Sequence, residues 1–161
     1  MAKSIDDIIT DVMKREGGAS ITLTGDDWGG RTQYGIAEAS NPGAWIDGKI
    51  TEAEARHIYM SKYVIGPGFD KITDFALQAV LIDFGVNSGP ATAIKYLQRL
   101  LGVTEDGILG PKTLAAVNAK QNLTNKVVAE RVKMIGHIVT KSPSQIKFLN
   151  GWLNRALEFL L

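Results

Sequence analysis

One segment of the sequence, Thr73 to Gly89, most constrains what this chain can fold into. Apolar residues occupy nearly every side of a helix drawn through this segment: Phe75, Leu77, Val80, Leu81 and Phe84. A helix without a polar face is stable in water only when other elements cover it on all sides. We therefore predict a buried central helix that has Thr73 as its N-cap and ends between Gly85 and Gly89.

The rest of the chain supplies helices that can surround such a core. Apolar residues recur at helical spacing, and Thr51 with Glu54 forms the pattern of a capping box, of which Ser4 with Asp7 is a weaker variant. Prolines at 90 and 111 are placed to open two further helices. The expected surrounding helices span about 5–16, 51–64, 91–101, 111–119, 123–140 and 144–160.

A short segment near the N-terminus has a different character. Ser20–Thr24 alternates polar and apolar residues, and a stretch rich in glycine and aspartate separates it from Thr32–Ile36. An alternating run followed by such a turn-rich stretch indicates a short β-hairpin or a loop with ragged strands. The predicted fold class is therefore mainly α, a helical domain with a small β-hairpin wing.

Size and charge limit the possible functions. The 161 residues are enough for one compact core, and 18 basic against 17 acidic side chains leave a formal charge of +1. The chain therefore lacks the excess of basic residues that is typical of nucleic-acid-binding proteins. The chain has no cysteine and two isolated histidines, so we expect no metal site and no disulfide. The N-terminal stretch is charged throughout, and we expect neither a signal peptide nor stable membrane insertion.

Glu16 is the candidate catalytic residue. It ends the first predicted helix and is followed by Gly17 and Gly18. The negative end of the helix dipole disfavours a charged carboxylate, which suits a general acid that works near neutral pH. The competing interpretation is a solvated glutamate at a helix end, and position alone favours that interpretation.

Asp26 and Asp27 follow across the glycine-rich turn. Glycosidases commonly pair a protonated acid with a second carboxylate that holds a water or stabilises an oxocarbenium ion. Aspartate beside glycine is also the usual composition of a turn, and each residue taken singly fits that structural interpretation better. Thr32 and Tyr34 alternate with Gln33 and so share one strand face, which either offers hydroxyls to a sugar or is simply the outer side of the strand.

Two motifs in this region together resemble a known family. Glu16-Gly17-Gly18 is followed by Asp27-Trp28-Gly29-Gly30-Arg31-Thr32-Gln33-Tyr34-Gly35-Ile36. This order is similar to the signature of glycoside hydrolase family 108, the phage and bacterial N-acetylmuramidases with a lysozyme-like fold. The likeness continues along almost the whole chain, in Ala55-Arg56-His57-Ile58-Tyr59 with Tyr63, Phe84 to Gly89, Leu97 to Gly102, Asp106 to Thr113 and Gly151 to Arg155.

The resemblance implies cleavage of the β-1,4 bond between N-acetylmuramic acid and N-acetylglucosamine, without a cofactor. Glu16 matches the catalytic acid of the family, and Asp27, Thr32 and Tyr34 fall on matching positions beside the cleft. Spacing in a related phage lysozyme arrangement of Glu, Asp and Thr favours Asp26 instead of Asp27, and both stay open. In this chain Ser20–Thr24 stands where the family often has prolines.

Three later segments have both a structural and a functional interpretation. Asn87-Ser88-Gly89 either lines a sugar cleft, since an amide both donates to and accepts from an N-acetyl group, or ends a helix. The turn Asp106-Gly107-x-x-Gly110-Pro111-x-Thr113 resembles turns of peptidoglycan-binding modules and is foremost a structural turn. The amphipathic segment 148–160 predicts core packing, and a membrane-disturbing helix is the minor alternative.

The leading hypothesis from the sequence is a peptidoglycan hydrolase of the endolysin type. We expect a single monomeric domain over 1–161, in which 1–90 carry the catalytic half and 91–161 a peptidoglycan-binding-like helical half. The resemblance further implies accumulation in a host cytoplasm until a holin releases the enzyme to the periplasm and cell wall. The alternatives are a non-catalytic peptidoglycan-binding module and a helical interaction protein.

Overall fold

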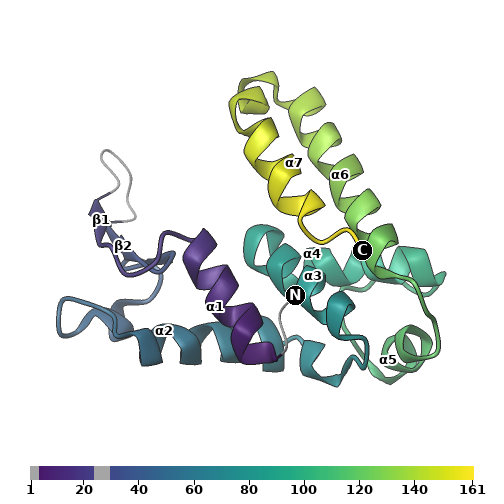
Figure 1. Ribbon diagram of the computed structural model, residues 1–161, viewed down its shortest axis with the longest axis horizontal. Helices are drawn as coiled ribbons and strands as arrows, with labels where there is room; N and C mark the ends of the chain where they lie inside the picture. Colours follow the sequence, from purple (N-terminus) through teal and green to yellow (C-terminus); the bar gives the residue numbers. More distant parts are fainter. Residues whose placement is uncertain (1–3, 24–29) are drawn as a thin grey trace. The chain divides into compact units, whose positions relative to one another are not determined.

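The computed structural model describes residues 4–23 and 30–161, and the chain divides into two compact units, Met1–Lys62 and Tyr63–Leu161. The described residues form seven α-helices and one small antiparallel sheet (Figure 1). This architecture confirms the fold class predicted from the sequence.

The first unit is built on two helices that pack together. Helix α1, Ile5–Arg15, buries the apolar face predicted for it, and helix α2, Glu52–Tyr59, packs against it. Both predicted caps are present. The Ser4 hydroxyl accepts from the Asp7 backbone N–H, and Thr51 and Glu54 bond reciprocally in a capping box. The buried apolar residues of this unit are Ile8, Ile9, Val12, Met13, Ile36, Trp45, Ile50, Ala55 and Tyr59.

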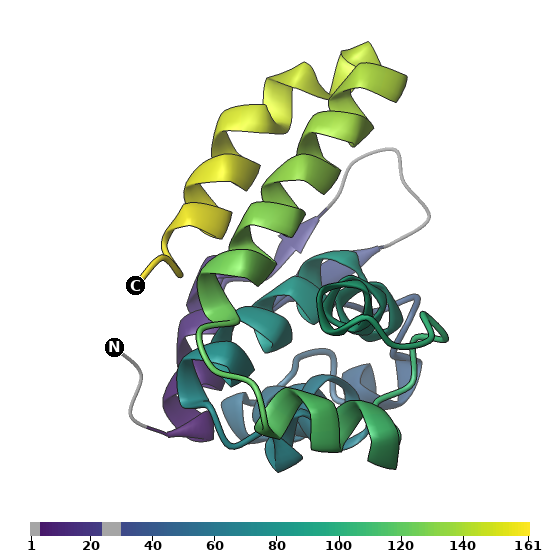
Figure 2. The same ribbon diagram turned by 90° about the vertical axis from the view of Figure 1, so that its right-hand side faces the viewer.

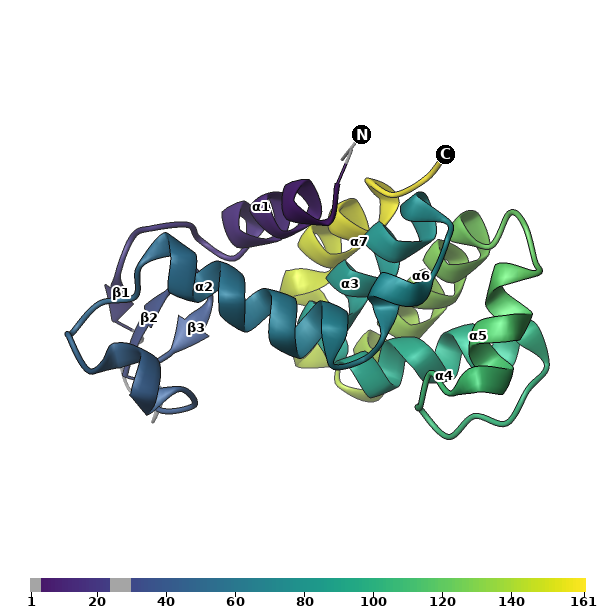
Figure 3. The ribbon, with the colours of Figure 1, turned by 90° about the horizontal axis from the view of Figure 1, so that it is seen from below.

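Three short strands lie beyond the C-terminal end of α1 (Figure 3). They are β1, Thr22–Leu23, β2, Arg31–Gln33, and β3, Ile36–Ala37, paired antiparallel in the order β1-β2-β3. The predicted segment Thr32–Ile36 contains parts of two strands, because Tyr34 and Gly35 have φ angles of 52° and 74° and turn the chain back between β2 and β3. Two such residues between paired strands form a tight hairpin turn of the mirror-image type. A 3₁₀-helix, Pro42–Trp45, follows the sheet.

The second unit is centred on the helix predicted to be buried. Helix α3, Phe75–Ser88, has eight buried residues and packs against α4, Pro90–Leu101, and α6, Thr124–Lys141. The predicted N-cap is wrong by one residue. Asp74 caps α3 by accepting from the Leu77 N–H at 3.1 Å, and Thr73 instead donates its N–H to the Asn118 side chain.

Short irregular helices precede this core. Helix α2 continues directly into a π-helix, Met60–Ile65, and a 3₁₀-helix, Phe69–Lys71, leads towards α3. The Gln78 amide, buried in α3, donates to the carbonyls of Phe69 and Ile72. One buried amide therefore satisfies backbone groups of the irregular segment that water cannot reach.

Helix α5, Pro111–Asn118, follows the glycine-rich turn singled out in the sequence. The turn is organised by Gln98, which is fully buried in α4. The Gln98 amide donates to the Asp106 carboxylate, the Ile108 carbonyl and the Thr113 hydroxyl, and accepts from the Gly107 N–H at 2.9 Å. The residues of the Asp-Gly turn are therefore engaged in holding α4 and α5 together.

The last two α-helices form a hairpin in which α6 and α7, Leu149–Leu157, run side by side (Figure 2). The single helix predicted over 144–160 begins as a 3₁₀-helix, Pro143–Phe148. The core packing expected for this segment is only partly observed. Ala156 is buried, whereas Phe148, Leu157 and Leu160 are 46%, 45% and 52% exposed, because within this unit α7 packs chiefly on α6.

Candidate active site

Glu16 lies at the C-cap of α1, half-buried, where a glycine pair ends the helix. The N–H of Gly17 donates to the Lys14 carbonyl and the N–H of Gly18 to the Met13 carbonyl at 3.0 Å. These two bonds form a Schellman motif, which requires left-handed backbone that glycine adopts without strain. Gly17 and Gly18 have φ angles of 102° and 62°. The Glu-Gly-Gly motif thus specifies both where the helix ends and which side chain stands at its end.

The hairpin turn of the sheet packs directly against Glu16. The Gly18 carbonyl accepts from the Tyr34 N–H at 2.8 Å, and the Tyr34 carbonyl accepts from the Tyr59 hydroxyl at 2.7 Å. A methyl group at Gly35 would come within 2.6 Å of the Glu16 Cβ and 2.9 Å of the Tyr59 oxygen. Only glycine fits at this contact. The motif that contains Gly35 therefore packs against the Glu16 side chain, which the Glu-Gly-Gly motif places at the end of α1.

A buried glutamine joins the sheet to the rest of the first unit. Gln33 donates to the Ala19 carbonyl at 2.8 Å and accepts from the Ile50 N–H at 2.7 Å. It thereby ties β2 to the chain after α1 and to the chain before α2. The positioning roles of Gln33, Gly35 and Tyr59 did not follow from the sequence, although all three lie inside the motifs that carry the family resemblance.

The other candidates of the first unit have distinct places. Thr32 is half-buried in the central strand β2, where its carbonyl accepts from the Thr22 hydroxyl at 3.4 Å. Tyr34 is half-buried in the hairpin turn, so the expected common strand face with Thr32 is not formed. Asp26 and Asp27 lie outside the described residues.

An ion pair stands beside the sheet. Arg31 of β2 donates to both carboxylate oxygens of Glu38 and to the Gly48 carbonyl, and its guanidinium lies 5.0 Å from the Trp45 ring centroid. The hydrogen bonds from Arg31 lower the pKa of Glu38, and the bonds to Glu38 raise the pKa of Arg31. Both groups therefore stay charged at neutral pH and close the sheet onto the 3₁₀-helix that follows.

The remaining two candidates, Asn87 and Ser88, belong to the second unit. They occupy the last turn of α3, with Asn87 exposed and Ser88 half-buried. Across residues 4–23 and 30–161, no group of three His, Cys, Asp or Glu side chains is arranged to hold a metal ion. In the same ranges, no helix has the length and apolar character needed to cross a membrane.

Comparison with known proteins identifies two families in this chain. Residues 9–89, about half of the chain, match the family described as glycosyl hydrolase 108, and residues 92–157 match the family described as predicted peptidoglycan domain. A search of curated protein sequences returned no match.

Eleven chains of solved structures are similar, among them SagA of Brucella abortus. The two proteins are 30% identical, the alignment covers 98% of this chain and 97% of SagA, and the TM-score is 0.68. This likeness accords with a lysozyme-like fold. The two family matches also support glycoside hydrolase activity and a role in peptidoglycan hydrolysis. On the evidence of its sequence and its fold, the chain belongs to the glycosyl hydrolase 108 family.

Proposed function

We propose that this protein is an N-acetylmuramidase that cleaves the β-1,4 bond between N-acetylmuramic acid and N-acetylglucosamine in peptidoglycan. The observation that carries the proposal is the packing around Glu16. A glycine pair presents the carboxyl at the end of α1, and the hairpin turn at Gly35 contacts its side chain. A general acid needs such a constrained position, since its proton must reach one defined oxygen of the substrate.

In the proposed reaction, protonated Glu16 gives its proton to the glycosidic oxygen as the bond from C1 to that oxygen breaks. The oxygen leaves as the hydroxyl of the next sugar, and positive charge develops on the ring that retains C1. A water molecule then adds to C1 and loses a proton to the solvent, from which Glu16 regains the proton that it gave. Asp27, or Asp26 in its place, stabilises the charge or holds the water together with Thr32, and Tyr34 fixes the sugar.

A matched pair of substitutions tests the role of Glu16. Glu16→Gln should lower the release of reducing ends from purified peptidoglycan about 10²–10⁴-fold, the usual contribution of general acid catalysis. Asp47 is exposed in the same unit, so Asp47→Asn removes a carboxylate there and should leave the rate unchanged. A Glu16→Gln protein that is folded and still active would overturn the proposal.

Mass spectrometry of the digest tests the bond that is cleaved. New reducing ends should lie on muramic acid, whereas reducing ends on glucosamine would assign the enzyme to another specificity. Wild-type protein that binds cell walls and releases no reducing ends would favour the non-catalytic binding module.

Single substitutions at the two neighbouring aspartates distinguish the candidates for the second carboxylate. If Asp27 acts in the reaction, Asp27→Asn should reduce hydrolysis far more than Asp26→Asn does. The opposite ranking would assign the role to Asp26, and two unaffected variants would remove the second carboxylate from the mechanism.

We also propose deployment as an endolysin that waits in the host cytoplasm. Expression in a Gram-negative host should cause lysis only when a holin is co-expressed. Lysis without a holin would contradict this route of release.

A further inference from the structure

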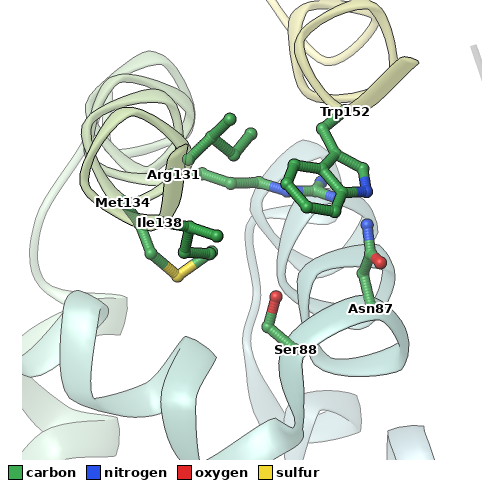
Figure 4. A pocket seen from close by; sticks show the side chains of 7 residues that line it. Asn87, Ser88, Arg131, Met134, Ile138 and Trp152 are labelled. Carbon is green, nitrogen blue, oxygen red and sulfur yellow. The ribbon is translucent and has the colours of Figure 1, made fainter. Parts of the chain in front are cut away.

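A small hollow opens in the second unit between the end of α3, the middle of α6 and the start of α7. Its volume is about 100 Å³, and its lining includes Asn87, Ser88, Arg131, Met134, Ile138 and Trp152 (Figure 4). A hollow of this volume holds more than one water molecule, so a substituent of a few heavy atoms fits into it.

Unused polar groups face this hollow. The side chains of Asn87 and Ser88 point from α3 towards the Trp152 ring, which hangs from α7 (Figure 4). None of these three side chains makes a hydrogen bond to another residue in the described part of the chain. An amide that donates and accepts, a hydroxyl and an indole N–H are therefore all available to a ligand.

A buried ion cluster holds the walls of the hollow in place. The Asp83 carboxylate of α3 accepts from Arg131 of α6 at 2.8 Å and from Arg155 of α7 at 3.0 Å. Asn87 lies one helical turn after Asp83, and Trp152 lies one turn before Arg155. Residues one turn apart share a helix face. The cluster that joins the three helices therefore also sets the distance between the amide and the indole.

The chemistry of the lining complements an acetamido group. Such a group has a carbonyl that accepts, an N–H that donates and a methyl that needs an apolar contact, and it has four heavy atoms. Asn87 and Ser88 can bond the polar atoms, while Met134 and Ile138 of α6 supply an apolar surface. The indole ring of Trp152 can cover the apolar face of the attached sugar and donate its N–H to a hydroxyl.

We propose that this hollow is a binding subsite for an N-acetylated hexosamine. The choice of ligand class rests on the proposed function, because both sugars of the peptidoglycan glycan carry an acetamido group. The proposal extends the predicted substrate contacts from Asn87 and Ser88 to Trp152, Met134 and Ile138, residues of the α6–α7 hairpin.

Nuclear magnetic resonance on the full chain tests this proposal. In ¹⁵N-labelled Glu16→Gln protein, N-acetylglucosamine should shift the Trp152 indole and Asn87 amide signals in a saturable way. Glucosamine, which lacks the acetyl group, should not. Absence of a saturable shift, or an equal response to glucosamine, would overturn the subsite.

Variants that remain folded sharpen the test. Asn87→Ala should weaken binding about tenfold, the effect of losing one or two hydrogen bonds. Trp152→Phe keeps an aromatic ring against Phe148, and it should weaken sugar binding because the indole N–H is lost. Asn150 is exposed on α7, and Asn150→Ala should bind as the parent does. Equal loss in Asn150→Ala and Asn87→Ala would count against the hollow.

The outcomes separate this inference from the proposed function. If Glu16→Gln abolishes hydrolysis but the acetylated sugar causes no saturable shift, the muramidase stands and the subsite fails. If the wild type releases no reducing ends but Trp152 responds to the acetylated sugar alone, the subsite stands and the muramidase fails.

Discussion

The two units of this protein use different physical means to hold their residues in place. In the first unit, Glu16 is positioned by left-handed glycines, a hairpin turn and the buried amide of Gln33. In the second unit, an apolar helix and a buried ion cluster determine where side chains lie. The position of the candidate catalytic residue thus depends on backbone conformation, whereas the shape of the proposed sugar subsite depends on helix packing.

The boundary between the units also differs from the boundary between the family matches. The glycosyl hydrolase match ends at residue 89 and so includes α3, yet α3 is the core of the unit that begins at Tyr63. The division predicted from the sequence, 1–90 and 91–161, follows the family match and stays a prediction about catalytic and binding halves. A segment that matches a family and a segment that folds together need not coincide.

Fragments give the largest expected effect. The fragment 91–161 lacks α3, whose buried residues pack against α4 and α6, and should be unfolded or molten. The fragment 63–161 contains α3 and should unfold cooperatively. Circular dichroism during thermal unfolding measures both. Cooperative unfolding of 91–161 would show that the family boundary is also the folding boundary.

Asp83 should cause the largest effect of a single substitution. Its side chain is fully buried and accepts from Arg131, itself 1% exposed. Asp83→Asn leaves buried guanidinium charge without its carboxylate and should destabilise the second unit by about 3–5 kcal/mol. Urea unfolding measures the free energy, and hydrogen exchange localises the loss.

A surface ion pair provides the control for Asp83. The Arg99–Glu105 pair lies in the same unit with side chains 51% and 38% exposed. Glu105→Gln should leave the unfolding midpoint unchanged, since exposed pairs contribute little. Equal losses in Asp83→Asn and Glu105→Gln would contradict the importance assigned to the buried cluster.

Gly35 tests the backbone dependence of the first unit. Gly35→Ala introduces a methyl group 2.6 Å from the Glu16 Cβ at a φ of 74°. We expect a loss of about 2–5 kcal/mol from left-handed strain and overpacking. A displaced Glu16 should also lower the rate of hydrolysis about 10²-fold.

A second glycine of the same unit is the matched control. Gly43 has open space around its Cβ position and no positive φ, so Gly43→Ala should change neither stability nor rate. Unfolding and reducing-end assays measure both variants. If Gly35→Ala retained wild-type activity, the contact with Glu16 would have no role in positioning it.

The smallest expected effect concerns two carboxylates, one in each unit. The Gln98 amide lowers the pKa of Asp106 below its ordinary 3.8, and Arg31 lowers the pKa of Glu38 below 4.5. Each therefore stabilises the fold above its ordinary pKa, and the contribution disappears as the pH falls through the lowered value. The differences in melting temperature between wild type and Asp106→Asn or Glu38→Gln should narrow below about pH 4.

Salt distinguishes the two carboxylates. At about 1 M salt the Debye length is about 3 Å, so the attraction between the charges of the half-buried Arg31–Glu38 pair should weaken, while the amide-bound Asp106 should not respond. A Glu38 effect that does not respond to salt would mean that hydrogen bonding dominates in both units.

Much of the fold follows from local pattern. The caps at Ser4 and Thr51, the prolines that open α4 and α5 and the apolar periodicity of the helices depend on nearest neighbours along the chain, and they were predicted. The split of the segment 32–36 into two strands was not, because Tyr34 adopts a left-handed φ that few non-glycine residues take. The partial exposure of α7 was also missed, since periodicity identifies an apolar face but not what covers it.

By itself, the sequence determined the helical class, the family and the choice of Glu16 as the candidate acid, because helix periodicity and the Glu-Gly-Gly motif are local. Only the tertiary structure decided that Gly35 packs against Glu16 and that the Tyr59 hydroxyl bonds the hairpin turn. It also decided that Asn87 faces Trp152. These residues are far apart in the chain. Their proximity results from the packing of whole helices and strands, which depends on many contacts at once and is not encoded in any one segment.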